Sequence, residues 1–303
     1  MASSKKTSRK KRTSGFPPAD EPAAKKSTAG SPSANSEKAP GRWGLKIMFL
    51  VVAIGGTYLA MWMKPGPDVL RLTYKVVNTY PHDTGAFTQG LLYDDGFLYE
   101  STGKEGQSSL RKVELETGKV LKQYNLPENI FAEGLALAGD KFYQLTWQNN
   151  VIFVYDRDFN ELKKVDYPHQ GWGLTFDGTH LIASDGTRLL YFLDPETLEE
   201  VKKVKIHMTD RSVGNVNEME VFGDDIYANV YQTDELYWID KNTGKVQAII
   251  DLSGLWPRSQ RKGRDEVLNG IAFDPATKRI WVTGKYAPHV WEIELTDKKD
   301  RVQ

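Results

Sequence analysis

The chain has 303 residues, 40% of them hydrophobic, which is enough apolar material for one large domain or two ordinary ones. Its 40 Lys and Arg residues balance 40 Asp and Glu residues, so we expect no nucleic-acid partner. The absence of cysteine excludes disulfides, thiolate metal sites and a cysteine nucleophile.

The N-terminal segment 1–43 is predicted to be disordered. It is rich in Ser, Ala, Pro and Lys and has too few large apolar side chains to offset the entropy lost on ordering. Residues 1–46 carry eleven Lys and Arg against three acidic residues. The basic run Lys5–Arg12 either binds nucleic acid or anionic lipid or, as we favour, belongs to a solvated tail that sets membrane orientation.

Residues 44–64 are predicted to form one transmembrane helix, a signal anchor. No residue in Ile47–Met63 is charged, and at about 1.5 Å per residue the segment can cross a hydrocarbon core of ~30 Å. Trp43 and Trp62 stand at the expected interfaces, and Pro65 ends the helix. A cleaved signal peptide is the alternative. With the anchor retained, the basic tail is cytoplasmic and the rest of the chain lies in the periplasm or outside the cell.

Residues 70–298 are predicted to form one all-β domain of repeated units. Five stretches share a pattern of two apolar strands around a turn: "FTQGLLYDDGFLYESTG", "FAEGLALAGDKFYQLTW", "GWGLTFDGTHLIASDG", "VNEMEVFGDDIYANVY" and "LNGIAFDPATKRIWVTGK". Their aligned positions are Gly90, Gly134, Gly173, Glu218 and Gly270, spaced by 44, 39, 45 and 52 residues. This spacing is the blade-sized period of a β-propeller.

Each of the first four units continues with a second hairpin around a turn of Asp, Pro, Asn or Gly, which gives four strands per unit. The fifth unit ends after its third strand, at 289–295. Segment 72–81, before the first unit, is a strand without a partner, and we expect it to complete the last unit. The sequence therefore predicts a five-bladed β-propeller closed by its N-terminal strand.

The alignment brings two sets of side chains to one mouth of this propeller. The first ring starts the innermost strands and consists of Gln89, Glu133, Trp172, Asn217 and Asn269. The second ring follows the second strands and consists of Gly103, Trp147, Gly186, Tyr231 and Lys285. Repeats ordinarily hold the same chemistry at equivalent positions, whereas these hold a carboxylate, a lysine, amides and aromatics. The mixture at a concave mouth indicates a small-molecule site.

Structural roles compete with this interpretation. The aromatic ring members suit packing between blades, and the amides suit capping of strand ends. Glu133 and Lys285 are harder to explain by packing, because unpaired charges near a propeller axis cost free energy. A structural ion pair between them stays open, and Glu100, on a second strand, is a further candidate for contact with substrate or with the lysine.

Other chemistries find little support in the sequence. It has no G-x-S-x-G, no P-loop and no G-x-G-x-x-G. The histidines lack metal-ligand spacing and are interpreted as surface or loop residues: His82, His169, His180, His207 and His289. We therefore expect neither a metal nor another cofactor.

The motifs "FTQGL", "YESTG", "FAEGLA", "LTW", "GWGLT", "VNEMEV", "NVYQTD" and "LNGIAFD…VTGK" together resemble the glutamine cyclotransferase family, the glutaminyl-peptide cyclotransferases of plant and bacterial type. The similarity runs from about residue 72 to 296 and covers all five repeats in order. It implies a five-bladed propeller and an enzyme that converts the N-terminal glutamine of peptides or proteins into pyroglutamate. Ammonia is released, and no catalytic metal takes part.

Residue by residue, the resemblance makes Glu133 the catalytic carboxylate and Lys285 the active-site lysine. It departs from the family at Tyr231, where tryptophan is usual, and this puts the fit of the substrate in doubt. With Asn269 and Glu100 added from the residue analysis, the candidate substrate-binding residues are Gln89, Trp147, Trp172, Asn217, Tyr231, Asn269 and Glu100.

The implied reaction needs a carboxyl group that carries a proton from the attacking α-amine to the leaving nitrogen, and a donor to the oxyanion. Glu133 and Lys285 suit these two roles. The alternative function is a membrane-tethered propeller that binds a peptide or glycan without catalysis, and a propeller lyase or lactonase is a third possibility. We expect a monomer.

Overall fold

The computed structural model describes residues 69–209 and 211–297. These residues form an all-β structure with one short 3₁₀ helix, η1 (Arg258–Gln260). Among them no helix has the length and apolar character needed to span a membrane. The predicted tail 1–43 and the predicted anchor 44–64 lie outside the described residues.

The twenty strands form five antiparallel units of four strands. The first unit consists of β2 (Thr88–Asp94), β3 (Phe97–Thr102), β4 (Ser109–Glu114) and β5 (Val120–Asn125). The second consists of β6 (Ala132–Ala138), β7 (Lys141–Thr146), β8 (Val151–Tyr155) and β9 (Glu161–Asp166). The third consists of β10 (Leu174–Phe176), β11 (Leu181–Ser184), β12 (Leu189–Leu193) and β13 (Glu200–Lys205). The fourth consists of β14 (Val216–Phe222), β15 (Asp225–Val230), β16 (Glu235–Asp240) and β17 (Val246–Asp251). The fifth consists of β18 (Leu268–Asp274), β19 (Arg279–Gly284), β20 (His289–Asp297) and β1 (Leu70–Pro81).

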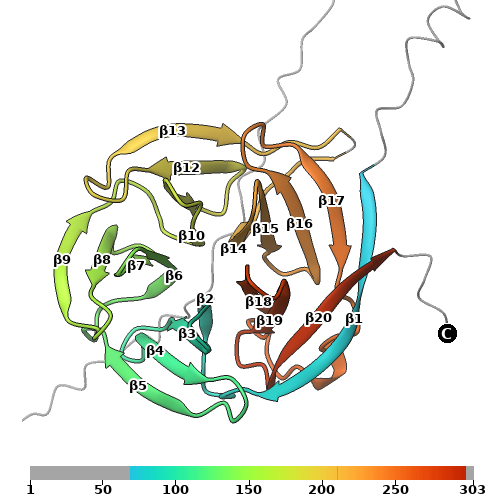
Figure 1. Cartoon of the computed structure of the whole chain (residues 1–303), viewed down its shortest axis with the longest axis horizontal. Coiled ribbons are helices and arrows are strands. Elements are labelled where there is room, and N and C mark those ends of the chain that lie inside the picture. The colour runs from blue at the N-terminus through green and yellow to red at the C-terminus, as the bar shows by residue number, and fades with distance from the viewer. Residues whose placement is uncertain (1–68, 210, 298–303) are drawn as a thin grey trace, which may run out of the picture. The chain divides into compact units, whose positions relative to one another are not determined.

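The units surround a common centre in the manner of a propeller (Figure 1). The first strand of each unit lies innermost, and each innermost strand packs against that of the next unit, from β2 through β6, β10 and β14 to β18 and back to β2. Five hydrophobic clusters fill the spaces between neighbouring units. Because the inner strands are covered on both faces, strand β2 is buried over most of its length, whereas the outer strand β5 alternates between half-buried and exposed side chains.

Strand β1 completes the fifth unit, as the sequence predicts. It pairs antiparallel with β20, from Leu72 opposite Asp297 to Pro81 opposite His289. Over Leu70–Leu72 it also pairs in parallel with β17, so that the fourth and fifth units form one eight-stranded sheet. We call the contact of β1 with β20 the closing seam.

Side-chain hydrogen bonds to one buried carboxylate strengthen the closing seam. Glu292 on β20 accepts hydrogen bonds from the guanidinium of Arg279, at 2.7 and 2.8 Å, and from the Tyr80 hydroxyl and the Asn78 amide of β1. These donors, Arg279 above all, hold the pKa of Glu292 at about 2. The network therefore ties the N-terminal strand to the last unit by its side chains as well as by its backbone.

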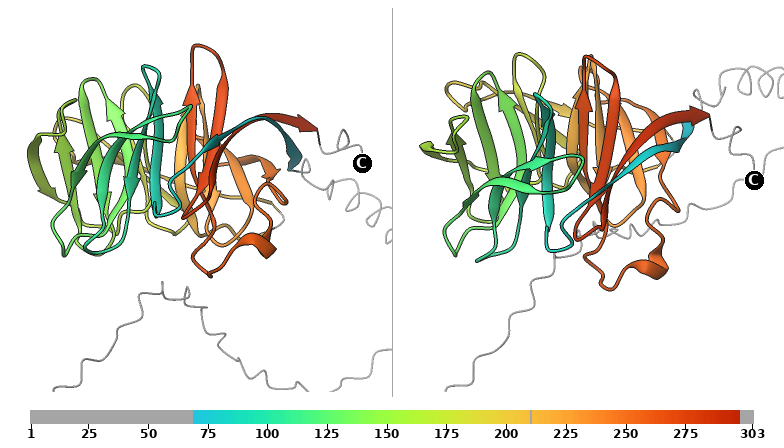
Figure 2. Two further views of the ribbon diagram at one scale, coloured as in Figure 1. Left: turned by 90° about the horizontal axis from the view of Figure 1, so that it is seen from below. Right: turned by 60° about the horizontal axis from the view of Figure 1, so that its bottom comes forward.

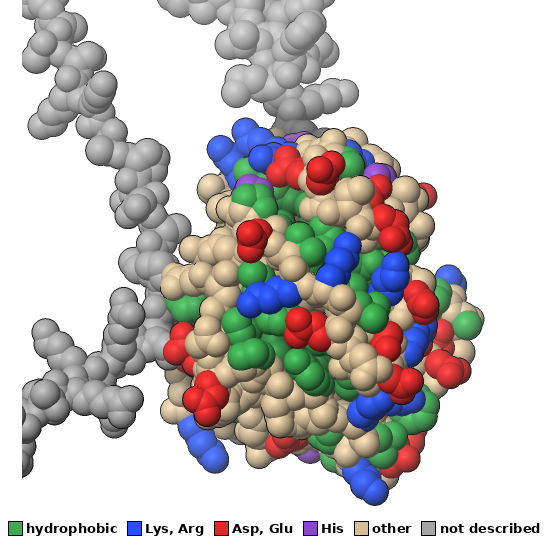
Figure 3. Space-filling model, turned by 90° about the vertical axis from the view of Figure 1, so that its left-hand side faces the viewer, with side chains coloured by type: hydrophobic (Ala, Val, Ile, Leu, Met, Phe, Trp, Pro, Cys, Tyr) green, Lys and Arg blue, Asp and Glu red, His purple; other side chains and the backbone are tan. Residues whose placement is uncertain are grey.

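The outer strands protect the molecule from edge-to-edge pairing. Strands β9 and β13 expose most of their side chains, and each carries lysines that disfavour addition of another strand. Figure 3 shows the side of the molecule that carries β9, where acidic and basic side chains are interspersed without a patch of one sign.

The connection between β17 and β18 is the longest one between two units, and it contains η1. Figure 2 shows it projecting beyond the ends of the strands. It leads into β18, so it lies at the end of the molecule where an innermost strand begins.

Candidate active site

The first ring is built on irregular strand starts. The pairing of β2, β6, β14 and β18 with their neighbours shifts register at Gln89, at Glu133 and the glycine after it, at Asn217 and at Asn269. A bulge adds residues to one strand and re-aims their side chains. Four of the five ring positions thus leave the regular alternation of the sheet and turn toward the centre. The fifth, Trp172, lies just before β10.

Hydrogen bonds join three residues of the first ring. The Gln89 amide donates to Oε1 of Glu133 at 2.9 Å. The Asn269 amide donates to Oε1 of Gln89 at 3.3 Å and to the carbonyl oxygen of Thr88 at 2.9 Å. The structure therefore brings Gln89, Glu133 and Asn269 together, from the first, second and fifth units.

Glu133 and Lys285 are the charged groups of the two rings, and both are buried, at 1% and 0% exposure. Burial raises the pKa of Glu133 well above its ordinary value, although Lys285 and Lys104 oppose the rise. Burial also lowers the pKa of Lys285 to about 8, against the pull of Glu133 and Asp265. These shifts bring both pKa values closer to neutral pH, where a side chain can readily accept and donate a proton.

Aromatic rings surround these two charges. The Lys285 Nζ atom lies 4.7 Å from the ring centre of Phe87 and 5.1 Å from that of Tyr231. Tyr231 meets the Trp172 indole edge to face, with centroids 5.8 Å apart. A cation over aromatic faces is stabilised by the ring quadrupoles, and more so where water is excluded.

The glycine at position 186 of the second ring makes room for the indole of Trp172. A Cβ atom at Gly186 would lie 2.6 Å from Cζ2 of Trp172, and the backbone there has a φ of +80°. Both observations require glycine. This member of the second ring therefore shapes the site without contributing a side chain.

Two amide oxygens in the first ring have no hydrogen-bond partner among the described residues, Oδ1 of Asn217 and Oδ1 of Asn269. Both asparagines are almost fully buried. Buried carbonyl oxygens without donors are costly, so they mark places where a ligand with N–H groups gains hydrogen bonds.

Two predicted site residues lie in other surroundings. Trp147 is half-buried at the rim, where its indole nitrogen donates to Gln170 and its ring meets Phe131. Glu100 was expected at the substrate or beside the lysine. Its carboxylate instead faces the side chains of His82 and Thr88, so a direct contact with substrate is not supported.

Sequence reasoning also missed residues of this region. His82 lies in a connection, one of its two expected settings, but its side chain is only 5% exposed, and no repeat marks it. Phe87 and Phe131 each stand two residues before a first-ring residue, and this repeated phenylalanine is a signal that could have identified them. Lys104 and Asp265, 3.3 Å apart, come from unaligned loops and carried no signal.

A hollow of about 400 Å³ lies beside the turn that carries Lys285. Tyr286, the next residue in the chain, lines it together with Trp256, Lys262 and Glu266 of the β17–β18 connection. Among the residues that the structure describes, no group of three or more His, Cys, Asp or Glu side chains is placed to hold a metal ion.

Comparison with known proteins gives the family. The sequence model of the glutamine cyclotransferase family matches residues 50–295. The chain belongs to this family. Among its glutamine cyclotransferase relatives, the glutaminyl-peptide cyclotransferase of Arabidopsis thaliana is 41% identical over 245 residues, which are 77% of this chain and 76% of the relative. The crystal structure of Myxococcus xanthus glutaminyl cyclase matches with a TM-score of 0.71 and 35% identity, over 75% of this chain and 98% of that one. The predicted family and its enzymatic character are confirmed.

Proposed function

We propose that this glutamine cyclotransferase converts the N-terminal glutamine of peptides or proteins into pyroglutamate with release of ammonia. The observation that carries the proposal is the pairing of a buried Glu133, whose pKa is raised, with a buried Lys285 inside an aromatic enclosure. Family membership selects this reaction among those that such a pair can support.

Glu133 is the proposed proton carrier. The α-amine nitrogen attacks the γ-carboxamide carbon of the same residue, a C–N bond forms, and the nitrogen loses a proton to the Glu133 carboxylate. The protonated Glu133 then gives that proton to the carboxamide nitrogen, which leaves as ammonia when its bond to carbon breaks. A carboxyl group with a raised pKa suits both transfers, and the Gln89 amide holds it in place.

Lys285 is the proposed partner of the oxyanion that develops on the carboxamide oxygen. A fixed cation in a site without water stabilises such charge strongly and needs no reorganisation during the reaction. With a pKa of about 8, Lys285 is mostly charged at neutral pH.

The remaining ring residues are proposed to hold the substrate. The free amide oxygens of Asn217 and Asn269 are acceptors for the α-amine and carboxamide N–H groups. Trp172 and Tyr231 form walls that favour the folded side chain needed for a five-membered ring. The hollow beside Tyr286 has room for the residues that follow the glutamine.

The test is direct. The purified protein is incubated with a Gln-initiated peptide and with the same peptide initiated by Asn, and ammonia and peptide mass are followed. We expect stoichiometric ammonia and the loss of one ammonia mass from the Gln peptide only. Binding of the Gln peptide without ammonia release would instead support the binding-module alternative.

We further propose that the five units are the blades of a five-bladed β-propeller, that segment 70–298 is the catalytic domain, and that the protein acts as a monomer. The enzyme is held on the extracytoplasmic side of a membrane by helix 44–64, with the tail 1–43 in the cytoplasm. The charge bias of residues 1–46 supports this orientation. Protease added to intact cells should digest the propeller and spare the tail; the reverse pattern refutes the orientation. A mature N-terminus near Pro65 identifies a cleaved signal peptide instead.

A further inference from the structure

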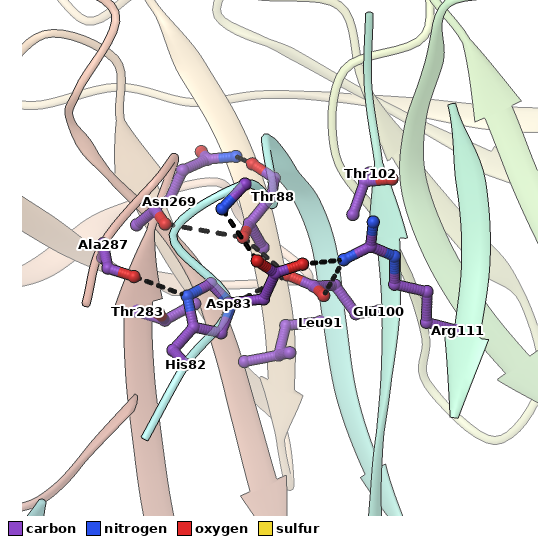
Figure 4. A network of polar contacts seen from close by, with 12 residues as sticks. His82, Asp83, Thr88, Leu91, Glu100, Thr102, Arg111, Asn269, Thr283 and Ala287 are labelled. Carbon is purple, nitrogen blue, oxygen red and sulfur yellow. Dashed lines mark hydrogen bonds and ion pairs between the residues drawn. The ribbon is translucent and has the colours of Figure 1, made fainter. Parts of the chain in front are cut away.

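A second buried charge cluster lies behind the first ring. Figure 4 shows Glu100 of β3 between His82, in the connection that follows β1, and Arg111 of β4. Oε1 of Glu100 lies 3.0 Å from Nε2 of His82, and Oε2 lies 3.8 Å from the Arg111 guanidinium, which also binds Asp83 at 2.8 Å. The reaction proposed above uses none of these groups directly.

The geometry assigns the charges of the pair. Nδ1 of His82 lies 2.8 Å from the carbonyl oxygen of Ala287, which can only accept, so Nδ1 carries a hydrogen. Nε2 faces a carboxylate that also accepts the Thr88 hydroxyl at 2.7 Å, so Nε2 donates as well. Burial disfavours the charged form of each group, but the charge and hydrogen bonds of its partners outweigh this effect. The pKa of His82 is therefore raised and that of Glu100 is lowered. His82 is an imidazolium and Glu100 is a carboxylate.

A chain of hydrogen bonds leads from this ion pair to Glu133. The Thr88 hydroxyl, held by Glu100, fixes the start of β2. The carbonyl oxygen of the same Thr88 accepts from Asn269, which also bonds Gln89. Gln89 in turn donates to Glu133. Thr88 thus connects Glu100 to the group that holds the proposed proton carrier.

A second set of hydrogen bonds leads from His82 to the turn that carries Lys285. His82 donates through its ring to the oxygen of Ala287, two residues beyond the lysine, and its backbone N–H donates to the oxygen of Pro288 at 3.1 Å. The Tyr286 N–H donates to the oxygen of Ala86 at 2.7 Å. The connection that contains His82 is therefore bonded to this turn on both sides.

We propose that His82 and Glu100 are positioning residues, and that their ion pair, which lies where the first and last units meet, fixes the position of Glu133 of the second unit relative to Lys285 of the fifth. The inference rests on the proposed function. It explains why a buried ion pair occurs at this point of the propeller: the two reacting groups come from different units, and backbone pairing alone does not fix the distance between them. A small misplacement of such groups is expensive for rate, up to about 100-fold for 1 Å.

The first test compares two isosteric carboxylate replacements in the full-length protein. Glu100→Gln keeps an acceptor for Thr88 but removes the charge that holds His82 protonated. We expect kcat for a Gln-initiated peptide to fall about 10- to 100-fold with little change in KM. Both quantities are measured well below the melting temperature of the variant. The control is Glu292→Gln, which removes a buried carboxylate that bonds Arg279 and Tyr80 in the closing seam and contacts no ring residue through its hydrogen bonds. It should lower the melting temperature and leave kcat unchanged.

A pair of milder variants keeps the test decisive if Glu100→Gln does not fold. Thr88→Val removes the hydroxyl that Glu100 accepts, and Thr88→Ser retains it. We expect kcat to fall several-fold in the first variant and to return in the second. The double variant His82→Gln with Glu100→Gln should be no slower than the slower single variant, because the pair acts as one unit.

The outcomes separate the two levels of the argument. If the wild type releases no ammonia from the Gln peptide, the proposed function fails and the positioning role fails with it. If the wild type turns over, but Glu100→Gln and Thr88→Val keep its kcat while melting earlier, the ion pair is structural only and the positioning role alone is overturned.

Discussion

Glu133 on β6 and Glu100 on β3 are two buried carboxylates, and burial has opposite outcomes for their pKa values. Both are almost inaccessible to water, at 1% and 2% exposure. Glu133 accepts from a neutral amide, and its pKa rises well above normal. Glu100 meets an imidazolium, a guanidinium and a hydroxyl, and its pKa falls.

The difference shows that partners, rather than depth, decide whether a buried carboxylate can exchange a proton. A carboxylate with two cationic neighbours stays ionised and serves as a fixed anchor. One with an amide neighbour and a more weakly acting lysine changes its protonation state easily, which is the property that general acid–base catalysis requires. Hydrogen bonds through Thr88, Asn269 and Gln89 connect the ionised Glu100 to Glu133, the carboxylate that can change its protonation state.

The largest expected effect comes from removing the changeable carboxylate. Glu133→Gln keeps the shape and an acceptor for Gln89 but cannot carry a proton. Because general acid–base catalysis typically contributes ~10²–10⁴-fold, kcat should fall by about that factor while KM changes little. Steady-state kinetics on a Gln-initiated peptide measure both quantities. A folded Glu133→Gln protein with near-wild-type turnover would remove the basis of the comparison and direct attention to another acid.

The repeats of the sequence locate the first carboxylate but not the surroundings of the second. Gln89, Glu133 and Asn269 occupy equivalent positions of innermost strands, so an alignment of five short motifs is enough to place them at one mouth. Their bulges and hydrogen bonds follow from that placement.

The cluster around Glu100 has no such signature. His82 lies in a connection outside the repeats, and its partners Glu100 and Ala287 come from the first and fifth units. Their meeting depends on how β1 closes the ring and on which side chains then face each other. Periodicity in the sequence does not encode these contacts, and for this reason the sequence predicts Glu100 as a contact of the substrate or the lysine and His82 as a surface or loop residue.

The second prediction concerns the cation that faces Glu133. If Lys285 must be charged, kcat/KM should decline above its pKa of about 8, roughly tenfold for each further pH unit. Lys285→Arg retains the charge at any accessible pH, so its alkaline decline should vanish even if its maximal rate is lower. A pH–rate profile of both proteins provides the measurement. An identical alkaline limb in the two would assign that limb to another group.

A smaller effect is expected at the aromatic wall formed by Trp172 and Tyr231. Trp172→Ala removes a surface that contacts Tyr231 and, by our proposal, the substrate. Losing the burial of a large aromatic side chain costs ~1.5–3 kcal/mol, so KM should rise about tenfold or more, with kcat less affected. Tyr231→Phe, which keeps the ring under Lys285, is the matched control and should leave KM near the wild-type value. A loss confined to kcat in Trp172→Ala would place the indole in the chemical step instead.

The smallest effect tests the comparison on stability alone, without any substrate. Since the pKa of Glu133 is raised on folding from its ordinary value of 4.5, ionisation opposes folding, and wild-type stability declines as the pH rises above that value. Glu133→Gln should therefore melt later than the wild type at pH 7, and the gain should disappear near pH 4. Lys285 offsets part of the burial penalty, so the increase in melting temperature should be small. It should amount to about 2–4 °C for each kcal/mol by which the free energy of unfolding increases.

Glu100 should show the opposite sign in the same measurement. Its pKa is lowered on folding, so its ionised form stabilises the native protein above the ordinary value of 4.5, and this contribution is lost as the pH falls. Glu100→Gln should accordingly melt earlier than the wild type at pH 7, and the two proteins should converge in acid. Scanning calorimetry of both variants between pH 3 and pH 7, a range that reaches below the ordinary carboxylate pKa values of about 4, reads out the two signs side by side. Shifts of the same sign at pH 7 would mean that burial dominates at both positions and that the partners of Glu100 do not set its charge.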